Sequence, residues 1–210
     1  LRTWRAMCPE LQEPWSEDAQ PEDWEGVTME NGRVVELVLE EFGLTGAVPA
    51  EIGRLSALRE LSLYGNQLTS VPAEIGQLTA LTRLNLAYNW LTSVPAEIGQ
   101  LTSLEQLDLR RNGLTNVPAE IGQLTSLVYL FLSYNQLTSV PAEIGQLTSL
   151  TALYLEDNQL TSLPAEIGQL TSLEWFDLSE NRLTSLRRRQ ARQVIGRLTS
   201  LSRMFFSDII

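Results

Sequence analysis

Apolar and polar positions recur in a fixed pattern over about residues 34–206 of the chain. The repeated unit is Leu-x-x-Leu-x-Leu-x-x-Asn-x-Leu, as at Leu58, Leu61, Leu63, Asn66 and Leu68. The segment Pro-Ala-Glu-Ile-Gly follows six of these units at a spacing of 23 residues, beginning at Pro49, Pro72, Pro95, Pro118, Pro141 and Pro164. A fixed period of this size indicates a protein that stacks equal structural units.

The alternation inside each unit predicts a short strand. In Leu61-Ser62-Leu63 the two Leu side chains point to one face of the strand and Ser62 points to the other. Parallel stacking places neighbouring strands about 4.8 Å apart and joins the inward Leu side chains into one core. The first strand is expected to begin at Val34.

After each strand the chain must turn sharply, which buries backbone groups. An Asn amide can both donate and accept hydrogen bonds, so we expect a structural ladder of Asn side chains to satisfy these groups. The ladder comprises Asn66, Asn89, Asn112, Asn135, Asn158 and Asn181.

Pro-Ala-Glu then predicts a short helical turn on the outer side of each unit. Pro loses no hydrogen bond at a first helical position, and the Glu faces the positive end of the turn. Gly76 and its equivalents are expected to end the turn with positive φ. We interpret the carboxylates as separate groups at helix starts, with a cation-binding strip as the alternative, at Glu51, Glu74, Glu97, Glu120, Glu143 and Glu166.

The recurring unit resembles the leucine-rich repeat family. The stretch from Trp24 to Val35, with Leu44-Thr-Gly-Ala-Val-Pro after it, looks like the N-terminal cap and first repeat of plant-type members. The later 23-residue units are similar to the intracellular repeats of Ras-pathway scaffolds. The resemblance implies an α/β fold, a right-handed solenoid with a parallel concave sheet and short helical or 3-10 turns on the convex side.

Three regions are expected along the chain: an N-terminal cap over 1–33, repeats over 34–186, and a C-terminal cap over 187–210. In the first cap, the spacing of Leu1, Trp4 and either Met7 or Cys8 predicts a short helix that Pro9 stops. An acidic segment with Trp15 and Trp24 follows, and we interpret it as a lid over the core of the first repeat. An aromatic ligand site is the alternative.

The C-terminal cap departs from the repeat. Good helix formers without Pro predict a longer outer helix from Arg187 to Gly196. The run Arg187 to Arg192 is interpreted as a solvated helix face, with a nuclear-import or phosphate-binding run as the alternative. A last strand is expected from Leu201, Met204 and Phe206.

Composition limits the classes of partner. The net charge is −11 and the chain has neither His nor Lys, so we expect no nucleic-acid partner. No apolar run is long enough to cross a bilayer. Cys8 is the only cysteine, which precludes an intrachain disulfide and favours a reducing compartment such as the cytoplasm. Because the chain starts at Leu1 without a Met, we expect a fragment or a processed product.

Groups for catalysis are scarce. Besides lacking His and Lys, the chain has no Gly-rich phosphate loop, and no Cys, His and carboxylate cluster has the spacing of a metal site. Acids such as Asp177 and Glu180 occupy exposed positions, a poor setting for acid–base chemistry. We therefore expect a protein that is not an enzyme and that uses no metal and no cofactor.

The outward strand positions are those that vary between units. One position reads Glu36, Glu60, Arg83, Gln106, Tyr129, Ala152, Trp175 and Arg203 along the chain. The next outward position reads Val38, Ser62, Asn85, Asp108, Phe131, Tyr154, Asp177 and Phe205. Folding requires none of these residues in particular, so their variety indicates a role other than stability.

Aromatic residues at these positions predict a binding site on the concave face. Tyr129, Phe131, Tyr154 and Trp175 fall on three adjacent strands and should form one patch, as protein interfaces often do. The predicted partner-binding set is completed by Arg83, Tyr88, Trp90, Arg110, Tyr134 and Asp177. Alternatively, Tyr and Phe merely suit exposed strands and pair across them.

The main functional hypothesis is a protein–protein interaction module whose concave face binds a protein or peptide partner. Two alternatives are recognition of a small ligand, such as a glycan or short peptide, and a purely structural repeat scaffold. Because Phe205, Ile209 and Ile210 leave an apolar end, the expected assembly is a monomer or a weak oligomer through that end.

Overall fold

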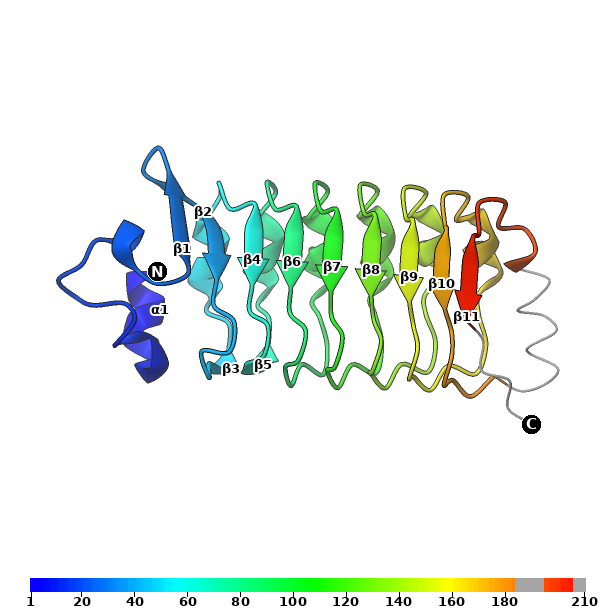
Figure 1. Cartoon of the computed structure of the whole chain (residues 1–210), viewed down its shortest axis with the longest axis horizontal. Helices are drawn as coiled ribbons and strands as arrows, with labels where there is room; N and C mark the ends of the chain where they lie inside the picture. The colour runs from blue at the N-terminus through cyan, green and yellow to red at the C-terminus, as the bar shows by residue number, and fades with distance from the viewer. Residues whose placement is uncertain (184–194, 206–210) are drawn as a thin grey trace.

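A parallel sheet forms one side of the molecule. The computed structural model describes residues 1–183 and 195–205. Within them a nine-stranded sheet has the order β1-β2-β4-β6-β7-β8-β9-β10-β11 (Figure 1). All neighbours from β2 onward are parallel, as predicted. The strands are β1 Val27–Glu30, β2 Arg33–Val38, β4 Glu60–Ser62, β6 Arg83–Asn85, β7 Gln106–Asp108, β8 Tyr129–Phe131, β9 Ala152–Tyr154, β10 Trp175–Asp177 and β11 Arg203–Phe205.

Short 3-10 turns lie behind the sheet, and among the described residues one follows each of β2, β4, β6, β7, β8 and β9 (Figure 1). They are η3 Ala50–Arg54, η4 Ala73–Gln77, η5 Ala96–Gln100, η6 Ala119–Gln123, η7 Ala142–Gln146 and η8 Ala165–Gln169. Each Pro is the residue before the turn rather than its first helical residue, with extended backbone such as φ −76° and ψ 158° at Pro72. Between turns and strands lies one core, in which inward residues such as Leu61 and Ile75 are fully buried.

The glycines of the turns serve close packing. The prediction of positive φ at Gly76 is wrong, since neither it nor its equivalents Gly53, Gly99, Gly122 and Gly145 adopt that conformation. Each turn ends instead at the following Leu, such as Leu78. A Cβ on Gly76 would lie 2.6 Å from the carbonyl oxygen of Glu97 in the next turn. Glycine is therefore required by the close approach of two turns.

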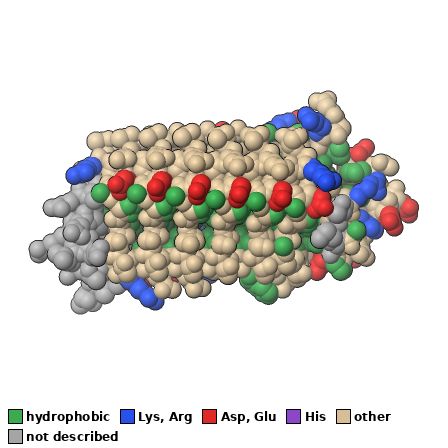
Figure 2. Space-filling view, turned by 180° about the vertical axis from the view of Figure 1, so that it is seen from behind, with side chains coloured by type: hydrophobic (Ala, Val, Ile, Leu, Met, Phe, Trp, Pro, Cys, Tyr) green, Lys and Arg blue, Asp and Glu red, His purple; other side chains and the backbone are tan. Residues whose placement is uncertain are grey.

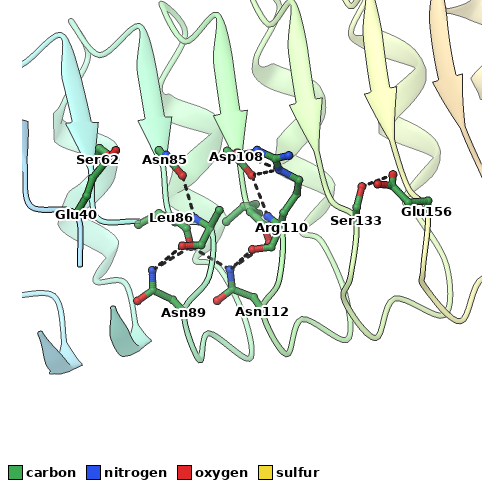
Figure 3. Close-up of polar contacts among 12 residues, drawn as sticks. Glu40, Ser62, Asn85, Leu86, Asn89, Asp108, Arg110, Asn112, Ser133 and Glu156 are labelled. Atoms are coloured by element: carbon green, nitrogen blue, oxygen red, sulfur yellow. Dashed lines mark hydrogen bonds and ion pairs between the residues drawn. The ribbon is translucent and has the colours of Figure 1, made fainter. Parts of the chain in front are cut away.

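The Asn side chains join each repeat to its neighbours (Figure 3). Asn89 Oδ1 accepts from the N–H of Leu68 at 3.0 Å, and its Nδ2 donates to the carbonyls of Leu63 and Leu86 at 2.9 and 3.2 Å. Asn112 Nδ2 also donates to Leu86, at 3.0 Å. Equivalent bonds are made by Asn66, Asn135, Asn158 and Asn181.

The N-terminal cap consists of α1 (Arg2–Met7), η1 (Pro9–Leu11), η2 (Pro21–Asp23) and β1. The rings of Trp15 and Trp24 stack with centroids 4.9 Å apart, and both are buried with Trp4 in the same core as the repeats. Their indole N–H groups donate to backbone carbonyls at 2.8 and 2.9 Å. The indole N–H of Trp4 is buried without a hydrogen-bond partner among the described residues. Burial of all three rings in the core is what a lid requires, and the lid remains a prediction.

Two features near the first repeat go beyond the prediction. β2 begins at Arg33, and β1 precedes it as an antiparallel partner. The turn between them is Asn31-Gly32, with φ values of 51° and 71°, which is the hairpin geometry that Asn-Gly favours. A second, two-stranded sheet pairs β3 (Thr45–Ala47) with β5 (Gln67–Ser70) below the main sheet in Figure 1.

At the C-terminal end, β11 pairs with β10 and contains Met204 of the predicted last strand. The expected helix lies outside the described residues except for its last two positions, as do Arg187 to Arg192 and Phe206. Ile195 and Leu198 are buried in the core. No helix in the described ranges is long and apolar enough to span a membrane.

The close approach of the turns predicts a large difference between two Gly→Ala substitutions. In Gly99→Ala the new Cβ would lie 2.5 Å from the Glu120 carbonyl oxygen, so we expect a loss of about 1–3 kcal/mol in the free energy of unfolding. In the control Gly113→Ala the nearest atom would be 3.5 Å away, and the change should stay within about 0.5 kcal/mol. Urea unfolding measures both, and equal losses would contradict the packing argument.

Candidate functional site

The register of the strands aligns the outward residues in two rows across the sheet. Pairing of β8 with β9 places Tyr129 beside Ala152 and Phe131 beside Tyr154. Pairing of β9 with β10 places Ala152 beside Trp175. The first row therefore reads Glu36, Glu60, Arg83, Gln106, Tyr129, Ala152, Trp175 and Arg203. The second row reads Val38, Ser62, Asn85, Asp108, Phe131, Tyr154, Asp177 and Phe205, and we call this side of the sheet the sheet face.

Aromatic rings form a continuous contact series across the C-terminal half of the sheet face. The series, called here the aromatic row, comprises Tyr129, Phe131, Tyr154, Trp175 and Phe205. Successive ring centroids are 6.4, 5.0, 6.1 and 5.5 Å apart. These separations are within the range of favourable aromatic pairs. The structure thus brings together four rings of the predicted patch and adds Phe205 to them.

The aromatic row exposes apolar surface. Tyr129 is 44% exposed and Phe205 is 43% exposed, whereas Phe131, Tyr154 and Trp175 are half-buried. The indole Nε1 of Trp175 is covered and has no hydrogen-bond partner among the described residues. The part of this ring that meets solvent is consequently apolar. Contiguous exposed apolar surface of this kind is typical of sites that bind other molecules.

A hollow of about 340 Å³ opens within the aromatic row. Ala152 lies between Tyr129 and Trp175 in the first row, and its small side chain leaves space that an aromatic residue would fill. The hollow is lined by Tyr129, Thr151, Ala152, Tyr154, Glu174, Trp175, Ser202 and Arg203. Five of these residues are not in the predicted binding set: Thr151, Ala152, Glu174, Ser202 and Arg203.

Arg110 borders the aromatic row and is held in place by a buried acid (Figure 3). Asp108 is 2% exposed, and its carboxylate accepts from Arg110 Nε at 3.0 Å and Nη2 at 2.6 Å. The guanidinium carbon of Arg110 lies 4.8 Å from the centroid of the Phe131 ring. The hydrogen bond to Asp108 raises the pKa of Arg110, so this arginine stays charged but largely neutralised by its partner.

Acidic groups border the row as well. Ser133 donates to Glu156, and the Ser179 hydroxyl donates to Asp177 at 2.6 Å (Figure 3 shows the first pair). The pKa of Tyr154 is raised above its ordinary value, first because partial burial disfavours the phenolate and then because Glu156 and Asp177 lie nearby. Arg110 acts in the opposite direction on this pKa, but less strongly than either carboxylate.

The turn after the strands carries a second cluster. The guanidinium of Arg111 lies 4.0 Å from the Tyr134 ring centroid and 5.3 Å from that of Tyr88. All three residues have positive φ, between 52° and 57°. The same conformation recurs at the equivalent positions Glu41, Gly65, Asp157 and Glu180, so it belongs to the turn of each repeat rather than to this cluster alone.

Two residues of the predicted set stand apart from the aromatic row. Arg83 pairs with Glu60, with Nε 2.9 Å from the carboxylate, on the N-terminal half of the sheet. Trp90 is 60% exposed and makes no ring contact with another aromatic residue in the part of the chain that the structure describes. The prediction therefore grouped residues that the fold separates.

The carboxylates of the 3-10 turns form an evenly spaced file on the opposite side of the molecule (Figure 2). Among residues 1–183 and 195–205, no group of three or more His, Cys, Asp or Glu side chains could hold a metal ion. Each 3-10 segment has its own Glu near its N-terminal end, as expected for separate carboxylates at helix starts.

The raised pKa of Tyr154 predicts its alkaline titration. In a difference titration of tyrosinate absorbance between the wild type and Tyr154→Phe, we expect Tyr154 to ionise above the ordinary value of about pH 10. Folding favours the neutral phenol, so the associated stabilisation is present below the ordinary pKa and is lost as pH rises through the raised one. Glu156→Gln should lower this pKa. An apparent pKa at or below the ordinary value would contradict the described surroundings.

Comparison with known proteins identifies the repeat. A family model described as a leucine-rich repeat region matches residues 37–112 and 106–207. Over 61 residues the chain is 48% identical to the leucine-rich repeat receptor protein kinase EMS1 of Arabidopsis thaliana, which corresponds to 28% of this chain and 5% of EMS1.

Solved structures of repeat proteins are similar as well. A leucine-rich repeat protein of Leptospira interrogans is 36% identical with a TM-score of 0.56, over 80% of this chain and 54% of that one. The ectodomain of the Arabidopsis receptor kinase HAESA, solved with an N-terminally extended IDA peptide hormone, is 28% identical with a TM-score of 0.75, over 93% of this chain and 33% of that one.

The chain thus spans about half the length, or less, of these relatives. The family model nevertheless covers more than half of this chain, and its repeats build the stacked parallel strands that the pattern predicts. The chain belongs to the leucine-rich repeat family.

Proposed function

We propose that this chain is a non-catalytic module that binds a protein or peptide partner on its sheet face, through the aromatic row. The observation that carries the proposal is the contact series from Tyr129 to Phe205, which no core packing requires. Aromatic anchors on an exposed surface supply much of the binding energy in protein interfaces.

The residues that hold the fold together are different from those on the sheet face, and this supports the proposal. Inward Leu and Ile, the Asn ladder and the Pro-Ala-Glu-Ile-Gly turns are nearly identical from repeat to repeat, and they hold the strands in place. Outward residues are free to vary, yet five aromatic residues meet on four adjacent strands. Pairing across strands explains individual contacts but requires no such run on one half of the sheet.

Solved relatives favour a peptide or protein as the partner class. The HAESA ectodomain was solved with a peptide hormone, and that of GASSHO1/SCHENGEN3 from Arabidopsis with CASPARIAN STRIP INTEGRITY FACTOR 2. This chain covers only 33% and 29% of those two chains, so their particular partners are not assigned to this protein. The net charge of −11 opposes a nucleic-acid partner.

The aromatic row predicts the effect of a triple substitution. Peptides are first selected with the intact chain from a random displayed library, and their affinities are measured by fluorescence polarisation. Phe131→Ser, Tyr154→Ser and Trp175→Ser together should weaken the selected peptides more than about 100-fold, because anchors of this type each contribute roughly 1–2 kcal/mol or more.

The matched control changes three residues of the same two rows on β6 and β7: Arg83→Ser, Asn85→Ser and Gln106→Ser. We expect nearly unchanged affinity in the control and folded circular dichroism in both proteins. Equal affinities of the two triple variants would sink the proposal. Selection of glycans on an array, with no peptide recovered, would favour the small-ligand alternative instead.

A further inference from the structure

The hollow in the aromatic row has the shape and surroundings of a pocket for a single side chain. Its floor is Ala152, which is 5% exposed, and its walls include the rings of Tyr129, Tyr154 and Trp175. Thr151 and Glu174 each precede the outward residue of their strand and complete one edge. A side chain entering here would contact both ring carbon and polar side chains of the lining.

Rings on the sheet face and its adjoining turn already accept guanidinium groups. The guanidinium carbon of Arg110 lies 4.8 Å from the Phe131 centroid, that of Arg203 lies 5.0 Å from Trp175, and that of Arg111 lies 4.0 Å from Tyr134. Ring faces attract cations through their quadrupoles. Among the described arginines, none lies over Tyr129 or Tyr154. Those two rings border the hollow.

Charge around the hollow favours a cation. Glu174 is an exposed lining residue that makes no ion pair with any described residue, and Glu156 and Asp177 act on the ring of Tyr154. Arg203 is the one described basic residue of the lining, whereas Arg110 is held by Asp108. The net charge of −11 would also speed the approach of a basic partner.

We propose that the hollow above Ala152 receives a basic side chain of the partner peptide, an arginine in preference to a lysine. Its aliphatic stem would pack on the walls, its guanidinium plane would stack on Tyr129 or Tyr154, and its charge would pair with Glu174. This inference rests on the proposed function, because it assigns one pocket within the same binding face.

The test uses the peptides selected on the intact chain. We expect an enriched Arg at one fixed position, and replacement of that Arg by citrulline, a neutral analogue of nearly the same shape, should cost about tenfold or more in affinity. Lys at the position should bind between the two. Added salt should weaken the Arg peptide more than the citrulline peptide.

Two variants locate the pocket. Glu174→Gln should weaken the Arg peptide about two- to fivefold and leave the citrulline peptide unchanged, and Ala152→Leu should block the hollow and weaken both. The controls Glu105→Gln and Gln106→Leu introduce the same residues at the equivalent positions just before and at the start of β7, and they should have no effect. Circular dichroism melting checks that the Ala152→Leu variant is folded. If that variant does not fold, the Glu174→Gln variant alone tests the assignment of the Arg to this hollow.

The outcomes separate this inference from the proposed function. Selected peptides that lack a fixed basic residue, yet lose binding in the triple Ser variant, would overturn the inference and leave the proposed function standing. Arg-containing peptides that are insensitive to Glu174→Gln would overturn the assignment to this hollow. Failure to select any peptide, or indifference to the triple Ser variant, would overturn the proposed function itself.

Discussion

Each repeat depends on its neighbours to satisfy the backbone groups of its turn. The carbonyl of Leu63 accepts from both Asn66 and Asn89, each at 2.9 Å, and the carbonyl of Leu86 accepts from Asn89 and Asn112. A buried backbone group without a partner costs on the order of 1–3 kcal/mol. The ladder therefore fixes the distance and register between repeats, and no unit is complete alone.

This constraint determines where the chain can vary. The Leu, Asn and turn Gly residues of one repeat are each required by a neighbouring repeat. A Cβ added to one of these glycines would lie only 2.5–2.7 Å from the nearest atom of the next turn. Outward strand residues are not required by the apolar core, although some of them, such as Asn85 and Asp108, also accept a hydrogen bond from a backbone N–H of the following turn. The aromatic row and the hollow above Ala152 lie at these outward positions, and Arg110 pairs with another of them, Asp108. A rigid stack thus presents a chosen set of side chains at fixed spacing, which is a suitable basis for recognition.

Periodicity was sufficient to predict the parallel sheet, its register and the rows of outward residues, because the alternation of strand positions and the 23-residue period are both explicit in the sequence. Contacts between repeats were harder. The close approach at Gly76 depends on the distance between turns, which no single repeat encodes. The hollow forms because the side chain of Ala152 is smaller than those of Tyr129 and Trp175, which lie on either side of it in the first row. The β1 hairpin was missed although Asn31-Gly32 signalled it.

The most direct test of the central claim is the indole N–H spectrum of the protein during titration with a selected peptide. Trp175 lies in the aromatic row, whereas Trp4, Trp15 and Trp24 are buried in the cap and Trp90 stands apart. If partners bind the sheet face through the aromatic row, the Trp175 resonance shifts and the three cap resonances stay in place. Shifts confined to the cap tryptophans, with Trp175 unchanged, would contradict the account.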